Sequence, residues 1–348
     1  MPSISIDTFF ACTLMVAVVI ITTVSVTGTM MTRIDSWKNL NEETYLRTLF
    51  DGIMSKPGVP SNWGADGNIK PSEFGLASIN SQNPNALDVD KVSRLNPEND
   101  FALSYTDILK AARLTDVAMK ISISQIMSIA ISLASNISQG DSTIYTFRIS
   151  VNQDSGPTTA LLHCYAMATN FLQDVYNSTS TDGVGYASFQ IPNASIGTAA
   201  IVAFARATQD QMMTACDVQL FAHLSNEISP NQTFLDLTPL NYTLDLSPKS
   251  ANTTIESYYA FSYSYQANLT EVSNTSRQIP KMLDTSPIVL VVTGLNSSQS
   301  FIEWTAYPEL PIETGANFNN SESHAFSSIV IIKDTLYKVT LDFGGVNP

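Results

Sequence analysis

The chain has 348 residues, which is room for two or three domains. Its formal net charge is −14 and only 14% of its residues are charged, so Ser, Thr, Asn and Gln supply most of the polar surface. This balance argues against a nucleic-acid partner, which requires a basic face, and against recruitment to an anionic membrane surface.

The first predicted element is an uncharged stretch from Thr8 to Met31, TFFACTLMVAVVIITTVSVTGTMM. As a helix it would be roughly 36 Å long, enough to cross a hydrocarbon core of about 30 Å. A cleaved signal peptide is the main alternative, but no basic residue precedes the stretch and its apolar run is too long. A buried core helix is less favoured, because β-branched residues dominate. We predict a retained anchor over residues 1–33 that contacts lipid through residues 8–31.

Asn-x-Ser/Thr sequons indicate which side of the membrane the rest of the chain occupies. None occurs before residue 136, although nine asparagines do. The ten sequons begin at Asn136, Asn177, Asn193, Asn231, Asn241, Asn252, Asn268, Asn274, Asn296 and Asn319. Their clustering predicts a glycosylated exterior. Arg33, Lys38 and Arg47 would place their flank in the cytoplasm, but that rule is weak before a long domain. We therefore expect a single-pass protein of the cell membrane, with its C-terminal bulk extracellular.

Helices are predicted for much of the region after the anchor. Apolar residues recur at spacings of three and four over residues 34–54, which predicts an amphipathic helix continuing the anchor. Shorter helices are expected at 87–95 and 97–115, the second with Asn96 as its N-cap. Residues 117–134 then alternate polar and apolar side chains and are expected to open as a strand.

This first part resembles archaeal type IV pilin-like membrane proteins of unassigned function. The resemblance rests on SIDTFF before the apolar run, on PGVPSNWG, and on FGLAS and LDVDKVSRL followed by SYTDILKAARL. It covers about residues 1–130 and implies a pilin-like α/β region over residues 34–138, with other pilin-like subunits or further copies of the chain as partners. The chain departs from the pilin pattern, because it has no basic leader and Asp7 is its only acidic residue near the helix start. Processing and filament assembly are left open.

The remainder of the chain is predicted to be β-structure. Alternating segments at 143–151, 159–168, 185–192, 199–207 and 215–224 are separated by turn signals and indicate a β-sandwich over residues 139–228. Within it, TDGVGYASFQIPN resembles a structural turn of Ig-like surface domains. Residues 229–348 are expected to form a further β-rich domain, and no internal repeat is evident. The predicted fold class is α+β, a transmembrane helix continuing into a long amphipathic helix, followed by Ig-like β-sandwich domains.

Cysteine and histidine were considered as sources of chemistry. Cys12 lies in the predicted span, whereas Cys164 and Cys216 lie in alternating apolar segments and could form a disulfide or remain two free buried thiols. His163 and His223 neighbour them in sequence, on what should be the outward face. Three cysteines without CxxC spacing do not predict a zinc site.

No motif demands a reaction. The sequence contains no HExxH, GxSxG, P-loop or GxGxxG pattern, and no pair of carboxylates stands out. We expect no catalytic residues, no metal and no cofactor. Tyr258, Tyr259, Tyr263 and Tyr265 form a ladder that is either a binding face for carbohydrate or a partner, or one wall of a sheet core.

These observations predict a non-enzymatic protein with a structural or adhesive role at the cell surface, such as a pilin-like subunit or an envelope component. A surface module that binds carbohydrate or peptide is the alternative hypothesis. A membrane-tethered hydrolase is a third, which would need clustered buried carboxylates in a cleft.

Overall fold

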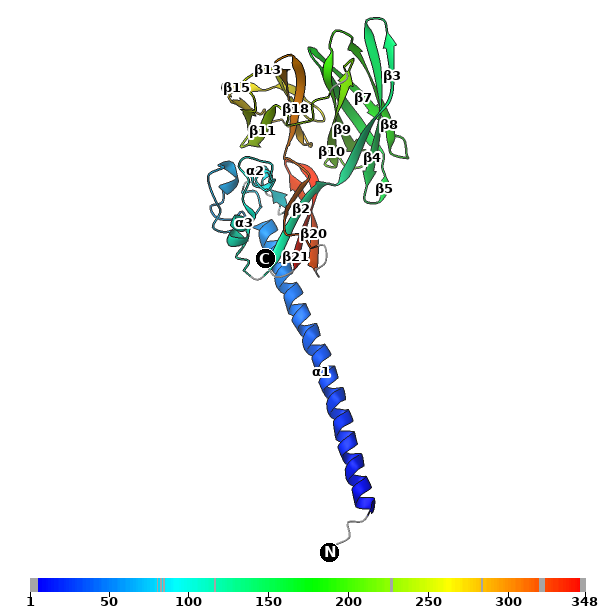
Figure 1. Ribbon diagram of the computed structural model, residues 1–348, viewed down its shortest axis with the longest axis vertical. Helices are drawn as coiled ribbons and strands as arrows, with labels where there is room; N and C mark the ends of the chain where they lie inside the picture. Colours follow the sequence, from blue (N-terminus) through cyan, green and yellow to red (C-terminus); the bar gives the residue numbers. More distant parts are fainter. Residues whose placement is uncertain are drawn as a thin grey trace. The chain divides into compact units, whose positions relative to one another are not determined.

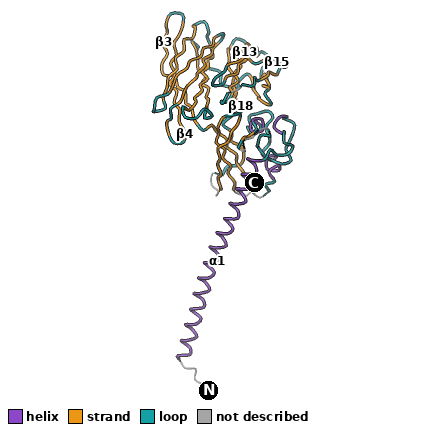
Figure 2. Tube along the Cα trace, turned by 180° about the vertical axis from the view of Figure 1, so that it is seen from behind, coloured by secondary structure: helices purple, strands orange, loops and turns teal. Residues whose placement is uncertain are grey.

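The computed structural model describes most of the chain: residues 6–79, 81, 83, 85–115, 117–225, 228–282, 284–318 and 323–344. The side chains of residues 6–8, 28–29 and 31–41 lie outside this description, as does the sequon at Asn319. The chain divides into two units, Met1–Asp51 and Gly52–Pro348. The first is helical, and strands dominate the second (Figures 1 and 2).

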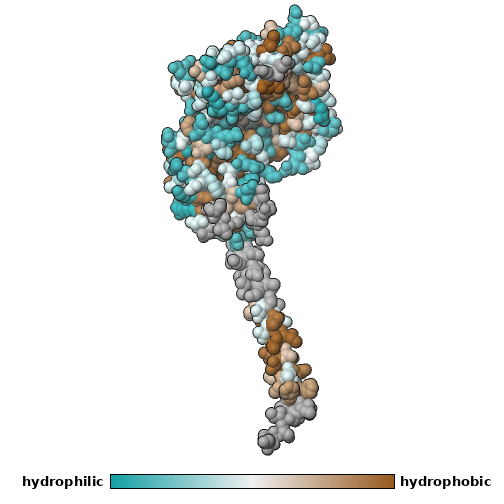
Figure 3. Space-filling view, viewed as in Figure 1, coloured by the Kyte–Doolittle hydropathy of each residue, from teal (hydrophilic) through white to brown (hydrophobic). Residues whose placement is uncertain are grey.

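The first unit is one uninterrupted helix, α1 (Ile6–Ser55), whose last turn belongs to the second unit. Its stretch Phe9–Thr27 is apolar, solvent-exposed throughout, and long enough to cross a membrane as an anchor or to serve as a signal sequence. Figure 3 shows a band of hydrophobic side chains along this part of the helix. Four threonine hydroxyls within it donate to carbonyls one turn earlier, which satisfies them without water: Thr13, Thr22, Thr23 and Thr27. The predicted apolar stripe over residues 34–54 is not shown, because the side chains of residues 34–41 lie outside the described ones.

The second unit begins with a base whose sheet joins the two ends of this unit. The order is β1 (Ala86–Leu87), β20 (Ser323–Ile332), β21 (Thr335–Gly344), β2 (Ala118–Gln125) and β19 (Ile312–Gly315). The C-terminal hairpin β20–β21 therefore pairs with β2, near the start of the unit, rather than with the strands just before it. The predicted ranges 34–138 and 229–348 are corrected accordingly, because residues 312–344 complete the base.

Helices in the base are shorter than predicted. Besides the turn η1 (Trp63–Ala65), they are α2 (Val89–Ser93) and α3 (Tyr105–Ala112). The second starts at Ser104, whose hydroxyl accepts from the Asp107 N–H, and ends at Arg113 in the left-handed region with a φ of 58°. Asn96 is not its N-cap, because the Asn96 side chain accepts the Glu98 N–H in a local turn instead.

Arg94 organises the loop that precedes α2. It is 1% exposed, and its guanidinium donates to five backbone carbonyls with no acidic partner within hydrogen-bonding distance among the described residues. The acceptors are the carbonyl oxygens of Trp63, Asp66, Gly67, Ile69 and Phe101. A planar cation with five donors suits this cage, and the carbonyl dipoles replace the water that burial removes.

The first β-sandwich is inserted after β2. One sheet contains β3 (Met127–Gln139), β4 (Ser142–Gln153), β5 (Gly156–Pro157) and β8 (Val184–Pro192). The other has the order β10 (Thr214–His223), β9 (Gly197–Ala207), β6 (Ala160–Ala168) and β7 (Phe171–Ser178). Their shared core includes Phe147, Leu162 and Phe189. The sandwich begins at residue 127 rather than 139, because the predicted segment 117–134 contains two strands that break at Ile126.

A second sandwich follows directly and repeats the connectivity of the first. One sheet has the order β11 (Leu235–Leu240), β12 (Thr243–Pro248), β16 (Ser276–Gln278) and β15 (Thr270–Ser273). The other has the order β14 (Gln266–Asn268), β13 (Thr253–Phe261), β17 (Ile288–Asn296) and β18 (Gln299–Tyr307). In the first sheet of each sandwich, β3, β4 and β8 correspond to β11, β12 and β16. In the second sheet, β6, β7, β9 and β10 correspond to β13, β14, β17 and β18. Both arrangements are consistent with an Ig-like sandwich. The sequence shows no trace of this repeat.

The two sandwiches pack against each other through their four-stranded sheets. The shared apolar cluster joins Tyr165, Val202 and Phe204 of the first to Phe261 and Val291 of the second. Strands β9 and β17 are therefore buried on both faces. This explains their continuous apolar runs, AAIVAF and IVLVV, where a half-exposed strand would alternate.

We predict that Arg94→Lys destabilises the protein by about 3 kcal/mol, because an ammonium group has three donors and leaves buried carbonyls unpaired. Arg113→Lys is the matched control, since the Arg113 side chain is 74% exposed and bonded only to Glu73. Thermal unfolding of the detergent-solubilised chain measures both. Equal effects of the two variants would contradict the role given to Arg94.

Candidate functional site: the cleft beside Glu309

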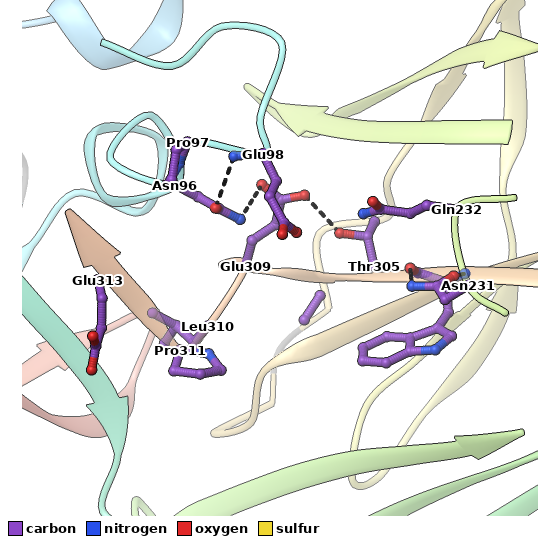
Figure 4. Close-up of a pocket in the computed structure, with 12 residues that line it drawn as sticks. Asn96, Pro97, Glu98, Asn231, Gln232, Thr305, Glu309, Leu310, Pro311 and Glu313 are labelled. Carbon is purple, nitrogen blue, oxygen red and sulfur yellow. Dashed lines mark hydrogen bonds between the residues drawn. The ribbon is translucent and has the colours of Figure 1, made fainter. Parts of the chain in front are cut away.

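One cleft in the described residues lies where the chain passes from the second sandwich back to the base. It has a volume of about 290 Å³. Its walls come from the base loop after α2, from the segment before β11, from β18, and from the β18–β19 connection, as Figure 4 shows. The lining residues are Asn96, Pro97, Glu98, Asn231, Gln232, Trp304, Thr305, Ala306, Glu309, Leu310, Pro311 and Glu313.

Glu309 is the buried acid of this cleft, with 7% of its surface exposed. The Thr305 hydroxyl donates to its Oε1 at 2.8 Å, and the side-chain amides of Asn99 and Asn96 donate to its Oε2 at 3.0 and 3.3 Å. Figure 4 shows the carboxylate between Asn96 and Thr305. Burial raises the pKa of Glu309 to about 7 even though these bonds favour the charged form. Glu309 thus ties the base loop to the second sandwich.

A second acid and an amide fix the wall formed by β18. Glu303 is fully buried and accepts the N–H groups of Gln232 and Phe234, and burial raises its pKa. The Asn231 side chain pairs with Trp304 twice, accepting from its N–H at 2.8 Å and donating to its carbonyl at 2.9 Å. These contacts hold Trp304, and with it the aromatic side of the cleft, in place.

The lining determines what the cleft can accept. It contains three carboxyl groups, three side-chain amides, one threonine and one tryptophan, and no lysine or arginine among the described residues. Such a surface favours neutral or cationic ligands with many donors and disfavours anions. Glu309 could supply a proton near neutral pH, but both of its oxygens are engaged within the protein. No cluster of three or more His, Cys, Asp or Glu side chains in the described part of the chain could hold a metal ion.

Of the two alternatives for Cys164 and Cys216, a disulfide or two free thiols, the structure has the free thiols. Cys164 and Cys216 are free, on β6 and β10 with β9 between them. Cys164 belongs to the core of the first sandwich, whereas Cys216 packs against the opposite face of the same sheet. Burial raises the pKa of both thiols to about 12, so neither is a reactive thiolate.

The histidines are buried rather than outward-facing. His163 stacks on Tyr176, with ring centroids 3.6 Å apart, and its Nε2 lies 3.2 Å from an Asp174 carboxylate oxygen. His223 is bonded to the Tyr145 hydroxyl and the Pro192 carbonyl. Each histidine is satisfied by its own neighbours, and no Cys–His pair is brought together.

The tyrosine ladder does not form one face. Tyr258 packs against the core of the second sandwich, and Tyr259 against the cluster between the sandwiches. Tyr263 is buried in that cluster, with the Arg206 guanidinium 3.8 Å from its ring centroid. Only Tyr265 of the four is exposed. The four tyrosines thus form neither one binding face nor one wall of a single sheet core.

The sequons fall into two groups. Those at Asn136, Asn241, Asn252, Asn268 and Asn274 are exposed. Their side-chain amides have no hydrogen-bond partner within the described residues. The side-chain amides of Asn177, Asn193 and Asn231 instead donate to the carbonyls of Tyr186, Gly140 and Trp304. Asn296 is half-buried.

Comparisons with known proteins do not identify a family. No family model matches the chain, and no curated protein does. Among solved structures, red sea bream transglutaminase matches with a TM-score of 0.22 and 9% identity, covering 58% of this chain and 32% of that one. HBP35 of Porphyromonas gingivalis has a TM-score of 0.18 and 11% identity, covering 54% of this chain and 64% of its own. The chain spans about a third of the transglutaminase. None of these likenesses bears on activity or supports the pilin resemblance.

We predict that stability falls as pH rises from about 5 to 8, because the raised pKa of Glu309 means that the folded state holds a proton which the unfolded state has lost. Glu309→Gln removes the contribution of Glu309 to this slope, which amounts to at most about 3 kcal/mol. Glu313→Gln is the control, because that carboxylate lines the same cleft but is 67% exposed. Thermal unfolding at pH 5 and pH 8 measures the effect. An unchanged slope in Glu309→Gln would sink the assignment.

Proposed function

We propose that this chain is a single-pass, membrane-anchored surface protein with a structural or adhesive role. The observation on which the proposal rests is the exposed apolar stretch Phe9–Thr27, in a helix that runs without a break to Ser55, at the start of the second unit. An apolar surface of this length is costly in water and stable in lipid. The retained anchor, the extracellular side and the pilin-like character of the first part all belong to this proposal.

The body suits display of a surface rather than turnover of a substrate. The two sandwiches share an apolar cluster. The chain leaves the base through β2 before the first sandwich and returns through β19 after the second, and these two strands are paired, so the sandwiches act as one block. Exposed sequons are concentrated in the second sandwich, at Asn241, Asn252, Asn268 and Asn274. A sequence with few charged residues and many hydroxyl and amide groups fits a glycosylated exterior.

Binding of a small polar ligand is the second candidate function. The cleft beside Glu309 favours it, because an aromatic wall, amides and carboxyl groups meet there without a basic residue among the described lining. A neutral carbohydrate or an amine fits that chemistry. Isothermal titration of the full chain with neutral oligosaccharides and with alkylamines, beside the Trp304→Ala variant, would separate this role from a purely structural one.

We predict that glycans occupy Asn241, Asn252, Asn268 and Asn274 and leave Asn177 and Asn231 unmodified. In the second pair the amide nitrogen that would receive the glycan donates to a backbone carbonyl at a sheet edge. Peptide mapping by mass spectrometry, on protein extracted from native membranes, reads each site separately.

The same map tests the anchor and the topology. A peptide that contains residues 9–27 is expected in the mature protein. Its absence would make the stretch a signal sequence, and the complete lack of glycans on all described sequons would contradict the extracellular assignment.

A further inference from the structure

A second cavity shares a wall with the Glu309 cleft. Four residues, at the end of β18 and in the β18–β19 connection, line both of them: Trp304, Ala306, Leu310 and Pro311. Figure 4 shows Leu310 and Pro311 on the wall of the Glu309 cleft. The second cavity also has a volume of about 290 Å³, and its other walls are β10 and the junction of β2 with β3. We call it the Asp217 cavity, after the one charged residue among its described lining residues.

The lining of the Asp217 cavity is mostly apolar. Met127 and Ile129 on β3 and Val218 on β10 lie in its walls, with the half-buried ring of Trp304. Besides Asp217, its polar side chains are two serines and Gln125, whose amide is engaged on both sides by the backbone of β10. The Glu309 cleft is instead lined by three carboxyl groups and three amides. The Asp217 cavity therefore favours a ligand with an apolar body.

Asp217 differs from the other buried acids in its lack of partners. Burial raises the pKa of four carboxyl groups in the described part of the chain, those of Asp90, Asp217, Glu303 and Glu309. The other three each accept hydrogen bonds from at least two further residues. Asp217 accepts only the N–H of its neighbour Val218, at 2.8 Å. No basic side chain among the described residues lies within ion-pair distance of its carboxylate.

Protection of a sheet edge is the simpler explanation of this charge. Strand β10 lies at the edge of its sheet, and a charged residue there keeps other strands from pairing. That role explains why Asp217 has no partner, but it does not explain the cavity beside it. A half-buried carboxylate in an otherwise mostly apolar cavity lacks the counter-charge that burial makes valuable.

We propose that the Asp217 cavity binds a small primary amine with an apolar body, whose ammonium group pairs with the Asp217 carboxylate. An ammonium group has three donors and supplies the missing counter-charge. The apolar side chains would contact the body, and the Trp304 ring also attracts a cation over its face. The volume is near the lower end for small-molecule sites, so the occupant is a small molecule rather than a protein segment. The inference goes beyond the proposed function and does not depend on the membrane anchor.

The charge of the ligand is tested first, on the native chain. Isothermal titration of the full chain in detergent compares phenethylamine with 2-phenylethanol, which has the same body and a hydroxyl in place of the ammonium group. Titration into protein-free detergent gives the heat of partition into micelles, which is subtracted. We expect the amine to bind at least ~10-fold more tightly, because its hydrogen bond joins two charged groups. Equal affinities, or no binding of the amine, would overturn the proposal.

Two variants then locate the amine. Asp217→Asn keeps the shape of the side chain and removes its charge, and we expect it to weaken phenethylamine binding at least ~10-fold. Glu98→Gln is the matched control and should leave the affinity unchanged, because Glu98 is an exposed carboxylate that lines only the Glu309 cleft. An Asp217→Asn chain that binds as tightly as the native chain contradicts the proposal. If Glu98→Gln alone weakens binding, the amine lies in the Glu309 cleft, which supports the second candidate function instead.

Discussion

The pairing of β2 with β21 is the interaction on which the second unit depends. It runs from Ala118–Gly344 to Gln125–Tyr337, and β2 also pairs with β19 through Ile123 and Ile312. The two sandwiches are inserted between β2 and β19, so their entry and exit lie side by side. Closing so long a loop costs entropy that only these non-local pairs and the base core offset. Loss of the C-terminal hairpin would therefore affect the whole second unit and not merely its end.

Burial on both faces of β9 and β17 couples the two sandwiches. The cluster between them is apolar at its centre, and polar bonds lie around it, such as the 2.6 Å pair between Arg206 and Asp284. Asp284 also accepts the Ser264 N–H, and the arginine lies over Tyr263, so neither charge is buried alone. The result is a four-layer block in which each sandwich supplies a face that the other needs.

Much of this architecture could be predicted from the sequence, and the failures have physical causes. The apolar stretch of α1 and most strands of the first sandwich follow from local pattern. The return of β20–β21 to β2 does not, because strand pairing over two hundred residues leaves no local signal. The sequence could not decide between a disulfide and two free thiols for Cys164 and Cys216, for a different reason. Period-two alternation shows which residues of one strand share a face of the sheet. In a sheet that is buried on both faces, it does not show which of the two cores a side chain enters. Glu309 was missed because its partners Asn96 and Asn99 lie some 210 residues away.

In this molecule, amide side chains occupy sheet edges, where many β-proteins use lysine to prevent the edge from pairing. Charged residues are few, and Gln125, Gln173, Asn177 and Asn231 each bond to the backbone of one residue at a sheet edge. A bonded amide satisfies an edge only at the residues it reaches, whereas a charge protects by repulsion at a distance. Amides therefore protect an edge residue by residue, and most residues of these edges have no such bond among the described residues. The same bonding accounts for the sequons at Asn177 and Asn231. Each asparagine bonds to the backbone of a sheet edge, and the serine or threonine that completes a sequon is common throughout this chain.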